Sequence, residues 1–174
     1  MIYIFLIVCL CVYVFAPDCT ALGVSMEHMN NAYIYQFAHA SWLHLIVNAL
    51  CLLLIFNPVR KMYEQRFGET GQCLFLAFSY LGSVLAALLC AQDIPTVGAS
   101  GMVFFIIGEL IMLRPNISQL WSLIYITIAI IVQFIRGNSN VALHIAAFVL
   151  GALFIIFRTL CKQHNERLNE CSDN

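Results

Sequence analysis

Four polar side chains in otherwise apolar sequence have the chemistry of acyl transfer. Ser100 begins one apolar run, His44 and Asn48 lie four residues apart near the start of another, and His144 lies near the start of the last. A serine hydroxyl becomes a nucleophile when a base within about 2.6–3.2 Å accepts its proton, and an imidazole is such a base. Imidazole, amide and backbone N–H groups can stabilise an oxyanion. These residues therefore predict hydrolysis of a peptide bond, with His44, Asn48 and the Ser100 N–H available to the intermediate.

The composition indicates that the solvent of this chain is lipid. Of its 174 residues, 62% are hydrophobic and 10% are charged, against roughly 45–50% apolar and about 25% charged in soluble domains. This excludes a water-soluble globule, a nucleic-acid binder and a disordered chain. The apolar runs are continuous and do not alternate in segments of about ten residues, so they predict helices and not a transmembrane β-barrel.

Six apolar runs predict an all-α fold, a polytopic membrane bundle of six transmembrane helices within a single domain, residues 1–161. The runs are Ile2–Ala16, Leu43–Phe56, Gln72–Ala91, Ser100–Leu113, Ile117–Ile135 and Val141–Leu160. The first run has no positive region before it, so we expect a retained helix and not a signal peptide. Residues 162–174 are polar and are expected to form a frayed cytoplasmic tail.

The positive charges predict the orientation of the bundle. Lys and Arg near span ends stay on the cytoplasmic side, and all eight of them except Arg136 fall on one side of the predicted spans. Both termini are therefore expected in the cytoplasm, which agrees with six spans. This topology places Ser100, His144, His44 and Asn48 at one depth, in the outer leaflet.

The fourth run is too short to cross a membrane by itself. Its 14 residues would extend about 21 Å, against roughly 30 Å of hydrocarbon. The residues before it, 92–99, include Pro95 and Gly98 and are expected to be irregular, and such backbone survives at membrane depth only inside protein or beside a water-filled cavity. We therefore expect Ser100 to begin a helix at the floor of a polar hollow. The alternative is that Ser100 simply caps a helix, as serine does well.

Small residues predict close contact between the fourth and sixth helices. Gly101 and Gly108 are seven residues apart, and His144 shares a helical face with Ala147 and Gly151. Such stripes let membrane helices approach backbone to backbone, although they occur in many packed bundles. Contact along these stripes would place the serine hydroxyl beside the imidazole.

The positions of the carboxylates in the sequence predict a Ser–His dyad and not a triad with a third, acidic member. No Asp or Glu lies at the depth of Ser100 on an outer helix end, and Phe104, one turn below Ser100, could hold the imidazole of His144 by stacking instead. Glu109 lies about 13 Å further along the same helix. We expect it to be a paired or snorkelling carboxylate and not a proton-relay residue.

The motifs resemble those of rhomboid intramembrane serine proteases. His39, His44 and Asn48 match H-x-x-x-x-H-x-x-x-N, the segment Gly98–Gly101 matches G-x-S-G, and His144 with Gly151 matches most of A-H-x-x-G-x-x-x-G. Their order, on the second, fourth and sixth spans, is also that of the family. The resemblance covers roughly residues 37–151, and with the flanking helices it describes the six-helix core of that fold.

The resemblance implies a role for each matched residue. Ser100 would be the nucleophile and His144 the general base, with His44 and Asn48 helping to form the oxyanion hole. The supporting residues would be Gly98, Gly101, Phe104, Ala147 and Gly151.

Two positions depart from the family pattern. Leu143 stands where alanine precedes the catalytic histidine, and Ala147 stands where the first glycine follows it. The added methyl group of Ala147 is expected to push the fourth and sixth helices slightly apart, or to be absorbed by a local shift.

The sequence thus predicts a serine endopeptidase that cleaves transmembrane protein substrates in the lipid bilayer without a cofactor, a metal or nucleic acid. We expect a multi-pass protein of the prokaryotic inner-membrane type. The alternative is a non-catalytic rhomboid-like binder or chaperone of membrane helices. A transporter is disfavoured because the spans show no internal repeat. A metal hydrolase is disfavoured because no carboxylate or cysteine is placed to join His44 and His144 as ligands.

Overall fold

The computed structural model describes residues 2–112, 120, 124 and 140–172. Within these residues the chain forms five α-helices: α1 (Ile2–Phe15), α2 (Trp42–Phe67), α3 (Gly71–Leu89), α4 (Ser100–Met112) and α6 (Val141–Ser172). Three short 3-10 helices, Thr20–Leu22, Met29–Tyr33 and Tyr35–Phe37, lie in the first loop between α1 and α2, and a fourth, Gly68–Thr70, joins α2 to α3.

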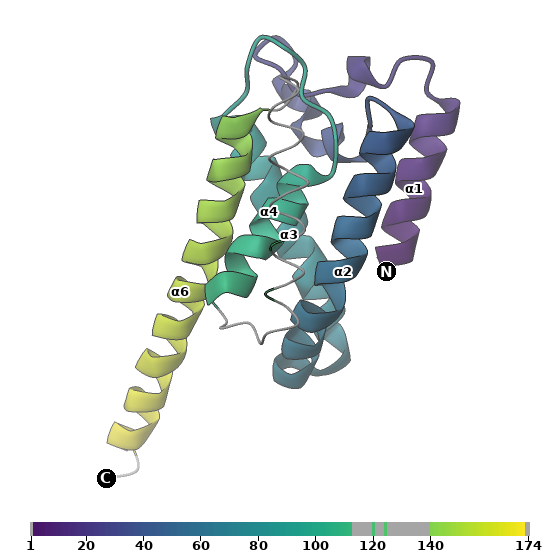
Figure 1. The fold of residues 1–174 in the computed structure, drawn as a ribbon. Coiled ribbons are helices and arrows are strands. Elements are labelled where there is room, and N and C mark those ends of the chain that lie inside the picture. The colour runs from purple at the N-terminus through teal and green to yellow at the C-terminus, as the bar shows by residue number, and fades with distance from the viewer. Residues whose placement is uncertain (1, 113–119, 121–123, 125–139, 173–174) are drawn as a thin grey trace.

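Helix α4 lies at the centre of the bundle, and α2, α3 and α6 pack around it (Figure 1). Ten of its 13 residues are buried, as expected of a helix that is apolar on all sides. Helix α1 lies on the outside, next to α2 (Figure 1). The residue that begins α4, Ser100, is therefore held inside the protein.

Three helices are long and apolar enough to cross a membrane. Their spans are Trp42–Gln65, Gly71–Leu89 and Val141–Cys161, while α1 and α4 are shorter apolar helices. These helices make the chain a multi-pass integral membrane protein. The predicted fifth span, Ile117–Ile135, lies outside the described residues except for positions 120 and 124.

Helix α2 is longer than the sequence predicts. The apolar run ends at Phe56, but the helix continues through Asn57 and Pro58 to Phe67. Most of residues 60–66 are good helix formers, which supports the helix beyond the proline. Arg60 and Glu64 add an i,i+4 ion pair at 2.8 Å. The helix ends at Gly68, whose φ of +64° and N–H bond to the Glu64 carbonyl form a glycine C-terminal cap.

Helix α6 also continues beyond its predicted end at Leu160. The polar segment 162–174, expected to be frayed, is helical as far as Ser172. Its Lys, Gln, Glu, Arg and Leu residues favour helix, and no Gly or Pro interrupts residues 152–172. The apolar run marks the membrane-spanning part of this helix and not its end.

Helices α4 and α6 touch backbone to backbone. A Cβ atom at Gly108 would overlap the carbonyl oxygen of Phe148, and one at Gly151 would overlap that of Phe105. Ala147 is fully buried in the same region. The two backbones therefore touch at Gly151 while the Ala147 methyl group is buried in the same region.

Gly151 is the position where an added methyl group should be least tolerated. An alanine there must displace the backbone of α4, and overpacking of this kind costs about 1–3 kcal/mol. We expect Gly151→Ala to lower the midpoint of thermal unfolding in detergent. Ala77→Val, which adds two carbons on the exposed face of α3, should leave the midpoint unchanged. A wild-type midpoint for Gly151→Ala would contradict this contact.

Candidate active site

Ser100 and His144 meet at the starts of their two helices. Ser100 is the first residue of α4, His144 lies in the first turn of α6, and Ser100 Oγ is 2.8 Å from His144 Nε2. Both residues are only 7% exposed. If Nε2 is to accept the hydroxyl proton, the neutral imidazole must carry its own proton on Nδ1.

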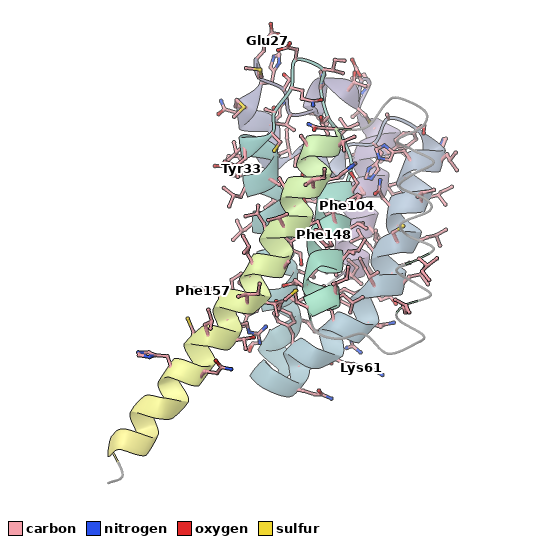
Figure 2. The ribbon with its side chains drawn as sticks, turned by 60° about the vertical axis from the view of Figure 1, so that its left-hand side comes forward. Glu27, Tyr33, Lys61, Phe104, Phe148 and Phe157 are labelled. Carbon is pink, nitrogen blue, oxygen red and sulfur yellow. The ribbon has the colours of Figure 1, made fainter. Side chains whose placement is uncertain are left out.

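The ring of Phe104 holds the imidazole from one side. The two rings are stacked, with centroids 4.3 Å apart and planes inclined by 15°. Phe104 lies on α4 beside α6, in the half of the bundle nearer Glu27 and away from Lys61 (Figure 2). Its side chain therefore fixes the imidazole plane on the side of α4 that faces α6.

Two potential oxyanion donors border a space that Gly98 leaves open. Gly98 has φ of +117°, and a Cβ atom there would lie 2.6 Å from His44 Cε1 and 3.4 Å from Asn48 Nδ2. Asn48 Nδ2 donates one bond to the His44 carbonyl at 3.0 Å, and the amide has a second N–H. The structure thus places both predicted donors next to Gly98, which lies two residues before Ser100 in the sequence.

The first loop holds the irregular segment before Ser100. Val24 and Thr96 exchange two backbone hydrogen bonds of 2.9 Å, and the Gly98 N–H donates to the Tyr35 carbonyl, also at 2.9 Å. The Ala99 N–H lies 3.5 Å from the acceptor nitrogen of His39. Three of the four residues before Ser100 are therefore held by one loop.

Helix α4 also begins against α3. A Cβ atom at Gly101 would overlap Ser83 Oγ and would lie 2.5 Å from the Tyr35 hydroxyl oxygen. Tyr35 and Ser83 share a buried hydrogen bond of 2.6 Å. Sequence reasoning missed both residues, because a tyrosine in a loop and a serine among small residues give no distinct signal.

Glu109 belongs to a separate buried group. It is completely buried, and Tyr63 donates its hydroxyl proton to Glu109 Oε1 at 2.6 Å. The guanidinium of Arg158 lies 4.7 Å from the centre of the Tyr63 ring. Glu109 is thus hydrogen-bonded inside the bundle and does not snorkel to the surface.

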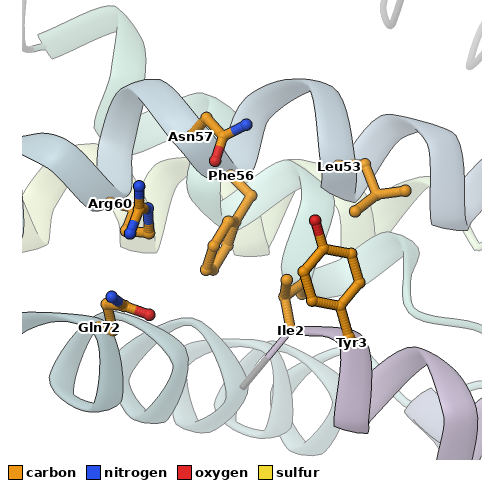
Figure 3. A pocket seen from close by; sticks show the side chains of 7 residues that line it. All are labelled: Ile2, Tyr3, Leu53, Phe56, Asn57, Arg60 and Gln72. Carbon is orange, nitrogen blue, oxygen red and sulfur yellow. The ribbon is translucent and has the colours of Figure 1, made fainter.

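A cleft of about 220 Å³ lies between α1, α2 and α3 (Figure 3). Its lining comprises Ile2, Tyr3, Leu53, Phe56, Asn57, Arg60 and Gln72. The lining residue of α2 nearest to His44 is Leu53, nine residues away along the helix, or about 14 Å, so this cleft is separate from the Ser100 site. Among the residues that the structure describes, no three His, Cys, Asp or Glu side chains are grouped as a metal site would require.

The comparisons with known proteins identify one family. The family model of the Rhomboid domain matches residues 26–160, more than three quarters of the chain. The matched region contains α2, α3, α4 and nearly all of the membrane-spanning part of α6. A search of curated proteins finds no match.

His39 is buried beside His44, with ring centroids 5.2 Å apart. Its Nδ1 donates to the Phe37 carbonyl at 3.3 Å, and its Nε2 faces the Ala99 N–H, which assigns the neutral tautomer. Burial, and secondarily the proximity of His44, lower the pKa of His39 to about 4. Between about pH 4 and pH 6.5, His39 is therefore protonated in the unfolded chain and neutral in the folded chain.

Acid should destabilise the bundle through His39. Because the folded pKa lies below the unfolded one, its contribution to stability is complete above about pH 6.5 and falls toward pH 4, by on the order of 2 kcal/mol at pH 5. Thermal unfolding in detergent should depend less on acid in His39→Asn than in the wild type. His28→Asn, in the exposed part of the first loop, should keep the wild-type dependence. Equal acid dependence of His39→Asn and the wild type would refute this linkage.

Proposed function

The chain belongs to the rhomboid family, and on that premise we propose that it is an intramembrane serine protease. It hydrolyses peptide bonds in or near the transmembrane segments of other membrane proteins. The observation that carries the proposal is the 2.8 Å contact between Ser100 Oγ and His144 Nε2. The family includes serine proteases, and this contact supplies the nucleophile and adjacent base that their chemistry requires.

In the acylation step, Ser100 Oγ attacks the carbonyl carbon of the scissile bond. His144 Nε2 takes the hydroxyl proton as the C–O bond forms, and the carbonyl π electrons move to the oxygen. When this tetrahedral intermediate collapses, the C–N bond breaks and His144 gives the proton to the leaving amine. The products are the free amine and an ester on Ser100.

Water completes the reaction by the same route. His144 takes a proton from the attacking water as a new C–O bond forms, and the bond to Ser100 Oγ then breaks while the proton returns to that oxygen. The net reaction consumes one water and one peptide bond. It needs no cofactor and no metal ion.

We assign the oxyanion hole to His44, Asn48 and the backbone N–H of Ser100. Gly98 supports it by leaving the space beside both side chains open. In this proposal Phe104 orients the general base by stacking. The remaining supporting residues, which set the packing of α4, are Gly101, Ala147 and Gly151.

We place the dyad in the outer leaflet of a six-span domain, residues 1–161, with both termini and the tail 162–174 in the cytoplasm of a prokaryotic-type cell. Arg60 and Lys61, near the end of α2 remote from the dyad, favour this orientation. Substrates are then cut near their outer ends. A substrate must present extended backbone to Ser100, so helix-weakening and small residues are expected around the scissile bond.

Removal of either dyad residue should abolish cleavage. We expect Ser100→Ala and His144→Ala to give no detectable product from a model transmembrane substrate in liposomes, and the wild type to be indifferent to a chelator. Ser79→Ala provides a matched control, since Ser79 is a buried serine on α3 that bonds to the Phe75 carbonyl. It should cleave at the wild-type rate.

Two results would contradict the proposal. Equal product from Ser100→Ala would exclude Ser100 as the nucleophile. A folded wild type that binds transmembrane segments without any Ser100-dependent cleavage would favour the non-catalytic binder instead.

Loss of one oxyanion donor should slow the reaction without preventing binding. We expect Asn48→Ala to lower kcat about 100-fold or more, the usual cost of removing one such donor, with a smaller effect on KM. Asn57→Ala changes an exposed residue lower on the same helix and should have no effect. An unchanged kcat in Asn48→Ala would remove Asn48 from the oxyanion hole.

A further inference from the structure

His144 is linked to the segment that carries Ser100 by a second route, through Asn140. Asn140 directly precedes α6 and is only 5% exposed. Its carbonyl accepts the His144 N–H at 3.2 Å, and its side-chain Oδ1 accepts the Leu143 N–H at 3.0 Å. Asn140 therefore caps the helix and bonds directly to the backbone of His144.

The amide nitrogen of Asn140 makes two bonds that lead away from α6. Nδ2 donates to the Cys90 carbonyl at 2.9 Å and to Thr96 Oγ1 at 3.2 Å. Cys90 directly follows the last residue of α3, and Thr96 lies four residues before Ser100. A side-chain amide can make about four hydrogen bonds. Asn140 therefore uses most of its side-chain hydrogen bonds to join the start of α6 to the end of α3 and to Thr96.

Thr96 is itself held in place by backbone hydrogen bonds. Its N–H and its carbonyl both pair with Val24, and the backbone of Gly98, two residues closer to Ser100, is bonded to Tyr35. Asn140 thus connects the first turn of α6 to the same rigid segment that positions Ser100. The same segment therefore positions both Ser100 and the first turn of α6, which carries His144.

We propose that Asn140 is a positioning residue that sets the depth and rotation of the first turn of α6, so that His144 Nε2 meets Ser100 Oγ. The inference rests on the proposed function, because the alignment matters only if the pair reacts. A displacement of about 1 Å at such a pair can cost about 100-fold in rate. The competing explanation is a simple helix cap, which serine would provide equally well.

Asn140→Ser separates the two explanations, because it keeps the cap and removes both bonds donated by Nδ2. We expect kcat for a model transmembrane substrate to fall about 10- to 100-fold, with KM within about twofold of the wild type. Thr96→Val removes one acceptor and should give a smaller fall. The double variant should be no slower than Asn140→Ser, since both changes break the same link.

Ile55→Val serves as the structural control, because Ile55 is a fully buried residue on α2 in the other half of the bundle. It should lower the thermal midpoint without lowering kcat. A wild-type kcat in Asn140→Ser, a rise in KM alone, or an equal fall in kcat for Ile55→Val would overturn the positioning role.

Failure of the proposed function gives a different result. If the wild type shows no Ser100-dependent cleavage, the protease assignment is refuted and this inference with it. If the wild type cleaves and Asn140→Ser is equally fast, only the positioning role is refuted.

Discussion

The shortness of α4 is the constraint around which the rest of the structure is arranged. Its 13 residues extend about 20 Å, against roughly 30 Å of hydrocarbon. The chain before Ser100 is irregular, and its residues 98–99 are buried, where unpaired backbone groups are costly. The first loop meets this cost, because Val24, Tyr35 and His39 bond to the backbone of residues 96–99. The first loop forms hydrogen bonds with this buried backbone and thereby also fixes the position of the Ser100 hydroxyl group.

The contact of α4 with α6 determines what that hydroxyl meets. Gly108 and Gly151 let the two backbones touch, and the crossing brings the first turns of both helices together. Phe104 then restricts the imidazole plane. Each part is ordinary helix packing, and their combination places the imidazole of His144 against a buried serine.

Much of this arrangement could be predicted from the sequence, because polar residues in apolar runs are conspicuous. Ser100 and His144 stood out for that reason, and the apolar runs located the described helices. Helices α2 and α6 both extend beyond the predicted apolar runs. In α6 the polar residues that follow are good helix formers, whereas α2 continues through Pro58, which propensity does not predict. The loop contacts of Tyr35 and Thr96 could not be predicted, because no periodic pattern relates distant irregular segments.

Labelling with a fluorophosphonate tests the central claim most directly, because it needs no substrate. Attack by an activated serine forms an O–P bond, releases fluoride and transfers the serine proton to its base. Mass spectrometry of the treated protein should place the phosphonyl group on Ser100 in the wild type and should find none in His144→Ala, although Ser100 remains. Equal labelling of Ser100 without the imidazole, or labelling only at another residue, would contradict the account.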